Sequence, residues 1–276
     1  MILTHGDPQV AQDALRVSLD IFRAGEIEVL APRMEWEKHA EFLDAAGVKK
    51  LSSARGLDEV DLCLVLGGDG TMLRAFHLTR DRCIPVAGVN LGRVGFLTTI
   101  NRYELEQGVL RLLAGDFKEY PLLGLEASLG TDLYRATNDV FVGRGGKTRA
   151  CFLGLTINGV TLFEVMCDGV VVGTPAGSSA YSLAAGGPLL GISVHAYVIS
   201  LVAPHAVGVR PVVAAPGDVL EIINIDDIDA SIDIDGDRVA TLGPHETVRI
   251  NTTPGMTTLA LLAGDSLYHH FRDRLL

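Results

Sequence analysis

The spacing of hydrophobic and polar residues divides this chain into two parts. Up to about residue 116, stretches with helical spacing alternate with short apolar runs. Such alternation is typical of a parallel sheet with helices on both faces. The spacing predicts helices at 8–24, 35–46, 72–79 and 103–114, and strands at 1–6, 27–31, 60–66 and 84–89.

After residue 116 the helical spacing fades. Short runs of β-forming residues take over, and Asn-Gly, Asp-Gly and Pro-Gly pairs mark turns between them. These features predict a β-rich second part, followed by a helix-like stretch at 266–276. The expected strands are 122–129, 133–136, 139–142, 151–157, 161–165, 198–202, 219–225, 228–234 and 257–262.

Composition narrows the classes of protein to consider. The chain has 276 residues, 48% of them hydrophobic, but no apolar run reaches the roughly 18 residues of a membrane span. Its first residues lack the basic and apolar regions of a signal peptide, so we expect a soluble cytoplasmic protein with no membrane partner. The formal net charge of -11 argues against a general nucleic-acid surface.

The sequence does not predict a metal site built from side chains. Its four cysteines form no C-x-x-C pair, and its eight histidines show no H-x-x-x-H spacing. The acidic stretch 226–237 is the one candidate for a calcium loop, but Leu242 occupies the position where such a loop needs a glutamate. Its alternation of Ile and Asp favours a strand with one solvated face.

The sequence Gly67-Gly68-Asp69-Gly70-Thr71 is the first candidate for chemistry. It follows an apolar strand and opens a helix, so bare backbone N–H groups and a positive helix end meet there, as at a phosphate site. An aspartate in an anion-binding turn is suited to accept a proton from a hydroxyl that attacks phosphate. The alternative is a simple turn with Asp69 as the helix N-cap.

Three further segments have compositions that suit ligand binding. Residues 90–98 form a second glycine-broken loop after a strand, where ligands bind in parallel sheets. Residues 168–188 are rich in glycine and small hydroxyls, with Tyr181 as a stacking surface, although a tight turn into a small-residue helix also fits. Asn138 and Asp139 form a polar pair ahead of an apolar run, which alone is also a common turn cap.

Read together, these segments resemble the NAD kinase family. The matching pieces are LGGDGT at 66–71, GVNLGRVGFLT at 88–98, the Asn138-Asp139 pair, and DGVVVGTPAGSSAYSLAAGGP at 168–188. Weaker matches lie at 204–211, 235–236 and 268–271. Their order and spacing extend over nearly the whole chain, so the set is far more specific than any single motif.

The resemblance implies a fold and a reaction. It implies an α/β domain at 1–116, a β-sandwich-like NAD-binding domain at 117–263, and a C-terminal segment, 264–276, that packs back on the first domain. It also implies a homodimer or homotetramer. The reaction, of class EC 2.7.1.23, transfers the γ-phosphoryl group of ATP, or a phosphoryl group of polyphosphate, to the 2′-hydroxyl of the adenosine ribose of NAD. Mg²⁺ or another divalent cation accompanies ATP.

The resemblance also assigns roles to residues. Asp69 resembles the general base, and Phe96 adds an apolar wall. Asp168 is expected to contact the nicotinamide end, partly across a subunit boundary. Phosphate and dinucleotide contacts are expected from Gly68, Gly70, Thr71, Arg74, Asn138, Asp139, Arg149, Thr174, Ser179, Ala180, Tyr181, Ala184 and Asp237. For Arg74 and Arg149 an ordinary solvated surface position is equally expected.

The chemistry of these residues suits that reaction. A ribose hydroxyl is a weak nucleophile, and a positioned carboxylate base contributes roughly 10²–10⁴ in rate. The chain has neither a P-loop nor the catalytic loop of protein kinases. It departs from the family pattern at Gly173 and Ala176, where hydroxyls are usual, at Ala184 in place of serine, and at Asp139 in place of glutamate.

Two alternatives remain open at this point. The GGDGT turn also occurs in lipid and sugar kinases, although the 88–98 and 168–188 segments argue against them. The lost hydroxyls favour a non-catalytic dinucleotide-binding protein, whereas the intact Asp69 argues for an enzyme.

Overall fold

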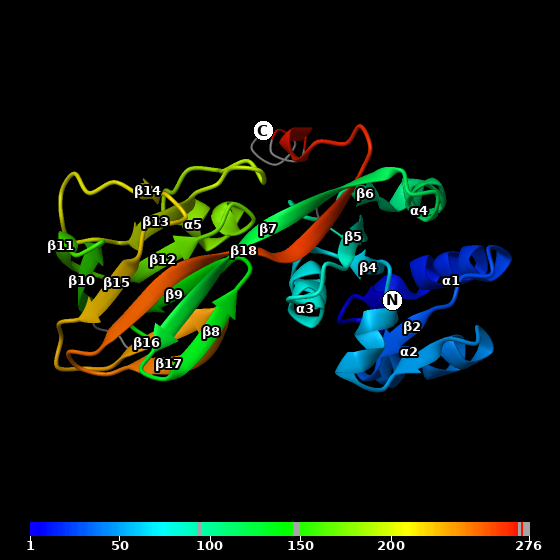
Figure 1. Ribbon diagram of the computed structural model, residues 1–276, viewed down its shortest axis with the longest axis horizontal. Helices are drawn as coiled ribbons and strands as arrows, with labels where there is room; N and C mark the ends of the chain where they lie inside the picture. The colour runs from blue at the N-terminus through cyan, green and yellow to red at the C-terminus, as the bar shows by residue number, and fades with distance from the viewer. Residues whose placement is uncertain (93–94, 146–149, 270–271, 273–276) are drawn as a thin grey trace. The chain divides into compact units, whose positions relative to one another are not determined.

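The chain folds into two compact units. A computed structural model describes residues 1–92, 95–145, 150–269 and 272. The first unit comprises Met1–Pro121 and Thr257–Leu276, and the second comprises Leu122–Met256 (Figure 1). Strands β7 (Phe117–Leu129) and β18 (Thr247–Leu262) each run from one unit into the other. Among the described residues, no helix has the length and apolar character needed to cross a membrane.

The sheet of the first unit is parallel. β4 lies between β1 and β5, and β5 also pairs in parallel with β6 and with the C-terminal part of β18. A separate parallel pair joins β2 to β3. The strands are β1 (Ile2–Thr4), β2 (Leu30–Pro32), β3 (Lys49–Leu51), β4 (Cys63–Gly67), β5 (Pro85–Asn90) and β6 (Ile100–Asn101).

Helices cover both faces of this sheet. Leu64 and Leu66 of β4 join the apolar cluster that α1 and α4 contribute to, and these side chains therefore lie on one face. On the other face, Gly88 of β5 lies directly against Met72 of α3. The helices are α1 (Pro8–Ala24), α2 (Arg33–Ala45), α3 (Asp69–Thr79) and α4 (Leu105–Leu113).

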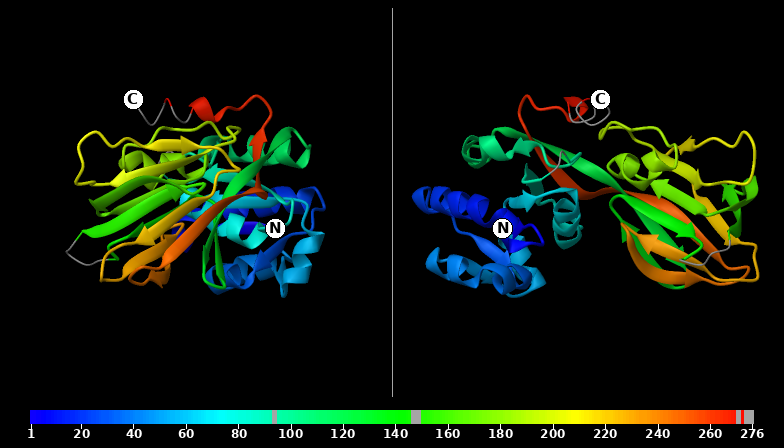
Figure 2. Two further views of the ribbon diagram at one scale, coloured as in Figure 1. Left: turned by 60° about the vertical axis from the view of Figure 1, so that its left-hand side comes forward. Right: turned by 180° about the vertical axis from the view of Figure 1, so that it is seen from behind.

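The second unit is a β-sandwich. One layer is antiparallel in the order β14-β13-β12-β9-β16-β17, and the other contains β8, β7, β18, β15, β10 and β11 (Figure 2). Alternate side chains of both layers, such as Val140, Val172, Leu153 and Ile222, fill one apolar core. The elements are β8 (Asp132–Ala136), β9 (Asp139–Gly143), β10 (Cys151–Ile157), β11 (Val160–Cys167), β12 (Gly169–Gly173), α5 (Tyr181–Ala184), β13 (Tyr197–Val202), β14 (Val212–Ala214), β15 (Leu220–Asn224), β16 (Ala230–Ile234) and β17 (Asp237–Leu242).

The predicted fold class is confirmed, but several boundaries are wrong. Helix α3 begins at Asp69, three residues before the expected start, because the glycine turn passes directly into helix. Strand β12 was expected to be part of a ligand loop. Its five residues, which begin and end with glycine, are all buried, so they show no polar alternation. The sequence pattern also missed β3 and β17, and the expected strand at 27–31 is Leu30–Pro32.

Candidate active site

Asp69 occupies the first turn of α3, directly after the carboxyl end of β4. The N-cap of the helix is Gly68 and not Asp69, so the simple N-cap interpretation of Asp69 is wrong. Asp69 is partly exposed. A side chain added at Gly68 or Gly70 would meet open space, which leaves the N–H groups of this turn accessible to a phosphate.

The second glycine loop fixes the carboxylate of Asp69. Its Oδ2 accepts a hydrogen bond from the Phe96 N–H at 2.8 Å, and its Oδ1 accepts one from the Leu97 N–H at 3.0 Å. A Cβ at Gly95 would overlap with Oδ1 of Asp69, so only glycine fits there. The two loops meet because β4 and β5 are parallel neighbours with Gly67 opposite Asn90.

These bonds suit a general base. Each carboxylate oxygen accepts one peptide N–H and keeps another lone pair for a proton. The orientation of the group is set by backbone atoms and not by flexible side chains, so little reorganisation is needed when a hydroxyl approaches.

The other predicted residues of the first unit have mainly internal contacts. Arg74 donates through Nη2 to the Thr4 carbonyl at 3.1 Å and to Oγ1 of Thr71 at 3.2 Å. Thr71 is buried, as is Phe96, whose main contribution to the site is the N–H that Asp69 accepts.

In the second unit, Asn138 and Asp139 lie at the start of β9 and are buried. Asp235, in the turn between β16 and β17, accepts hydrogen bonds from the N–H groups of Thr137, Asn138 and Asp139 at 2.9, 2.7 and 3.0 Å. Burial raises the pKa of Asp139 to about 7, and the nearby charge of Asp235 adds to this rise. Asp139 is therefore protonated at neutral pH to a much larger extent than an ordinary aspartate.

The Asn138 side chain has an unsatisfied acceptor. Its Oδ1 is buried, and no partner for it exists among the described residues. Buried polar atoms are nearly always hydrogen bonded, so an orphan acceptor at this position needs an explanation. A bound ligand with a donor group is one, and it agrees with the role that the family resemblance implies.

The loop after β12 supports the same segment. Thr174 is fully buried; its hydroxyl donates to the Thr137 carbonyl at 2.6 Å and accepts the Gly177 N–H at 3.0 Å. This hydroxyl is therefore engaged within the protein. A Cβ at Gly177 would overlap with the Asn138 carbonyl, so the loop and Asn138 pack backbone to backbone.

The remaining predicted residues near this loop differ in exposure. Ala180, Tyr181 and Ala184 are exposed, whereas Ser179 is partly buried and donates to the Ala176 carbonyl at 3.4 Å. The Tyr181 ring lies 5.5 Å from that of Phe141, centroid to centroid, and leaves 43% of the residue accessible for stacking.

The other predicted residues lie in other parts of the chain. Asp168 is partly buried and forms an ion pair with Arg144 at 3.1 Å. Asp237 is exposed at the start of β17. Arg149 lies outside the described residues.

Sequence reasoning assigned no role to four residues that organise these groups. They are Gly95, Arg144, Gly177 and Asp235. Both glycines lie inside recognised motifs, and the Asp235-Gly236 pair was noted as a turn and as a weak match to the family. The sequence motifs thus contained these residues, but they did not indicate which distant residues each of them contacts.

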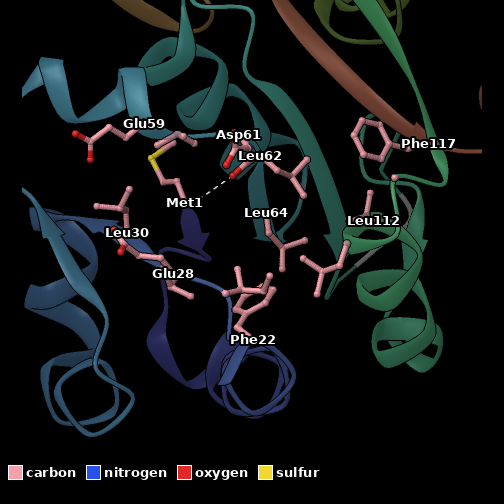
Figure 3. A pocket seen from close by; sticks show the side chains of 15 residues that line it. Met1, Phe22, Glu28, Leu30, Glu59, Asp61, Leu62, Leu64, Leu112 and Phe117 are labelled. Atoms are coloured by element: carbon pink, nitrogen blue, oxygen red, sulfur yellow. Dashed lines mark hydrogen bonds between the residues drawn. The ribbon is translucent and has the colours of Figure 1, made fainter. Parts of the chain in front are cut away.

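A cavity of about 380 Å³ lies elsewhere in the first unit. Figure 3 shows Met1, Leu62 and Leu64 among its lining side chains, with the Met1 amino group donating to the Leu62 carbonyl at 2.7 Å. These residues flank the amino end of β4, whereas Asp69 follows its carboxyl end. The cavity is therefore distinct from the Asp69 site.

Known proteins resemble the whole chain. Family models match at residues 34–117 (ATP-NAD kinase N-terminal domain) and 137–261 (ATP-NAD kinase C-terminal domain). The NAD kinase of Gemmatimonas aurantiaca is 35% identical over 224 residues, covering 78% of this chain and 77% of its own. That of Aromatoleum aromaticum is 30% identical over 283 aligned residues, covering 100% of this chain and 92% of its own.

Solved structures share the fold. The yeast NADH kinase complexed with NADH matches with a TM-score of 0.88 and 21% identity, over 99% of this chain and 86% of that one. An NAD kinase from Archaeoglobus fulgidus in complex with ATP matches with a TM-score of 0.67 and 22% identity, over 90% of this chain and 96% of that one. Together with the family models and the sequence relatives, these similarities show that the chain belongs to the NAD kinase family.

Proposed function

We propose that this NAD kinase family member makes NADP from NAD, with Asp69 as the general base. The observation that carries the proposal is the fixed carboxylate of Asp69, held by two N–H groups at the carboxyl end of a parallel strand. Sequence relatives named NAD kinase support the reaction.

The proposed step is a phosphoryl transfer. The 2′-oxygen of the adenosine ribose attacks the γ-phosphorus of ATP, and its proton passes to Asp69. The bond between the γ-phosphorus and its bridging oxygen breaks, and ADP leaves with that oxygen. Gly68 and Gly70 leave room for phosphates beside the helix N-terminus. Polyphosphate as an alternative donor would use the same groups.

The dinucleotide is proposed to bind in the second unit. Asn138 and Asp139 would contact its ribose and nicotinamide side, and Asp168 its nicotinamide end. Thr174, Ser179, Ala180 and Tyr181 would line the adenine pocket, and Ala184 and Asp237 would also contact the dinucleotide. Thr174 contributes through its backbone position, since its hydroxyl is already engaged.

Mg²⁺ is proposed to come with ATP. Among the described residues, no group of three or more His, Cys, Asp and Glu side chains could hold a metal. Mg²⁺ is usually held by substrate phosphates with one or two carboxylates. When bound, the ion neutralises phosphate charge.

The wider organisation is also a proposal. We infer a cytoplasmic homodimer or homotetramer, with residues 1–116 and 264–276 carrying the base and residues 117–263 binding NAD. The family resemblance supports this organisation.

The test is NADP formation by wild type and Asp69→Asn, with ATP or polyphosphate as donor. We expect kcat of the variant to fall by about 10²–10⁴, the contribution of a positioned base. Affinity for NAD, measured by calorimetry, should remain within about twofold. NADP formation at the wild-type rate in the variant would disprove the role of Asp69, and absence of NADP with any donor would disprove the reaction.

A further inference from the structure

Residues 137–139 have their backbone fully satisfied by two other segments. Their three N–H groups donate to the Asp235 carboxylate. Their carbonyl groups accept from the Thr174 hydroxyl, the Thr174 N–H and the Asp235 N–H in turn, at 2.6, 2.8 and 3.0 Å. Asp235 alone supplies four of these six bonds.

Asp235 lies in a tight turn ahead of Gly236. Its φ angle is +51°, which Asp adopts more readily than most non-glycine residues. Its negative charge also lies near the buried carboxyl of Asp139, which is unfavourable when both are ionised. Three charge-assisted hydrogen bonds from N–H groups offset that cost.

The side chains of Thr137 and Asn138 are less completely hydrogen bonded than their backbone. Oδ1 of Asn138 and Oγ1 of Thr137 are buried without a partner among the described residues, although every adjacent peptide group is paired. The protein thus holds the backbone rigidly while it leaves side-chain acceptors open. Such an arrangement is expected where side chains must stay in place to meet a ligand.

We propose that Asp235 is a positioning residue for NAD, which acts by holding the backbone of 137–139 so that Asn138 presents its amide to the dinucleotide. Asp235 itself contacts peptide groups and takes no part in phosphoryl transfer. The proposal rests on the proposed role of Asn138 in binding NAD. It goes beyond that role because it names the group on which the geometry of Asn138 depends.

The experiment compares Asp235→Ala and Asp235→Asn with wild type. We expect Asp235→Ala to raise KM for NAD about tenfold or more, since small misplacements of a binding group are costly, while kcat and KM for ATP change less than about threefold. Asp235→Asn keeps one acceptor oxygen, so it should give an intermediate KM. The matched control is Asp229→Asn, an exposed carboxylate ahead of the same strand, which should leave all constants unchanged.

Three results would overturn the proposal. The first is an unchanged KM for NAD in folded Asp235→Ala. The second is a parallel change in kcat and both KM values, which indicates a general loss of active protein. The third is failure of both variants to fold, which makes Asp235 a stability residue.

Asn138→Ala distinguishes the positioning role of Asp235 from the proposed contact of Asn138 with NAD. If Asn138→Ala raises KM for NAD but the Asp235 variants do not, only the positioning role fails. If Asn138→Ala leaves KM unchanged, the proposed contact of Asn138 with NAD fails, whatever the Asp235 variants do.

Discussion

The carboxylates of Asp69 and Asp235 each accept more than one backbone N–H group, yet their situations differ. Asp69 accepts two such bonds from the 96–97 segment and retains lone pairs in a partly exposed position. Asp235 accepts three from 137–139 and returns its own N–H to Asp139. The first arrangement leaves an oriented base available for reaction, whereas the second uses the carboxylate to build a binding segment.

A carboxylate that accepts backbone N–H groups can therefore serve either chemistry or binding. If so, disturbing the surroundings of Asp69 should change kcat, and disturbing the surroundings of Asn138 should change KM for NAD. Gly95 packs against Asp69, and Gly177 packs against Asn138, so substitutions of these two glycines provide the tests.

The largest effect is expected for Gly95→Ala. The added Cβ would overlap with Oδ1 of Asp69, so the carboxylate or the loop must move. We expect kcat to fall about 10²-fold because a displaced base loses its alignment, with KM for NAD nearly unchanged. Steady-state assays of NADP formation measure both constants.

Gly92→Ala is the matched control in the same loop. A Cβ at Gly92 would meet nothing within 4 Å, so the variant should behave as wild type. A normal kcat in Gly95→Ala would contradict the view that this loop sets the position of the base.

A smaller and different effect is expected for Gly177→Ala. Its Cβ would overlap with the Asn138 carbonyl, which the Thr174 N–H already holds at 2.8 Å. Overpacking of this kind costs about 1–3 kcal/mol, so we expect a lower Tm together with a KM for NAD raised about tenfold. Thermal unfolding and steady-state kinetics test the two parts.

Gly217→Ala controls for the substitution itself, since a Cβ there meets nothing within 4 Å. If Gly177→Ala lowered kcat without changing KM for NAD, the assignment of Asp69 to reaction and of Asp235 to binding would be wrong.

The sequence predicted part of this arrangement. It predicted the parallel sheet and a glycine loop after each of two strands, because the alternation of apolar runs and helical spacing indicates such a sheet. It did not predict β12, whose all-apolar residues lack periodicity, or the bonds of Asp235 to residues nearly a hundred positions away. Contacts between distant segments depend on packing, which a single sequence does not reveal.

The smallest expected effect concerns the pH dependence of stability, through Asp139. Its pKa of about 7 exceeds the ordinary value of 3.8, so the folded state binds a proton that the unfolded state has released. That stabilisation is complete below the ordinary pKa and is lost as pH rises through about 7. Between pH 5.5 and 8.5 it should decline by about 2 kcal/mol, at 1.36 kcal/mol per pH unit up to the raised pKa.

Asp139→Asn removes the titration while keeping the shape of the side chain. Relative to wild type, it should therefore become more stable as pH rises from 5.5 to 8.5, as chemical denaturation at each pH would measure. A constant difference across this range would mean that Asp139 is ionised throughout. The negative charge of Asp235 would then be opposed by the buried charge of Asp139, and the three N–H groups that Asp235 accepts would have to offset both.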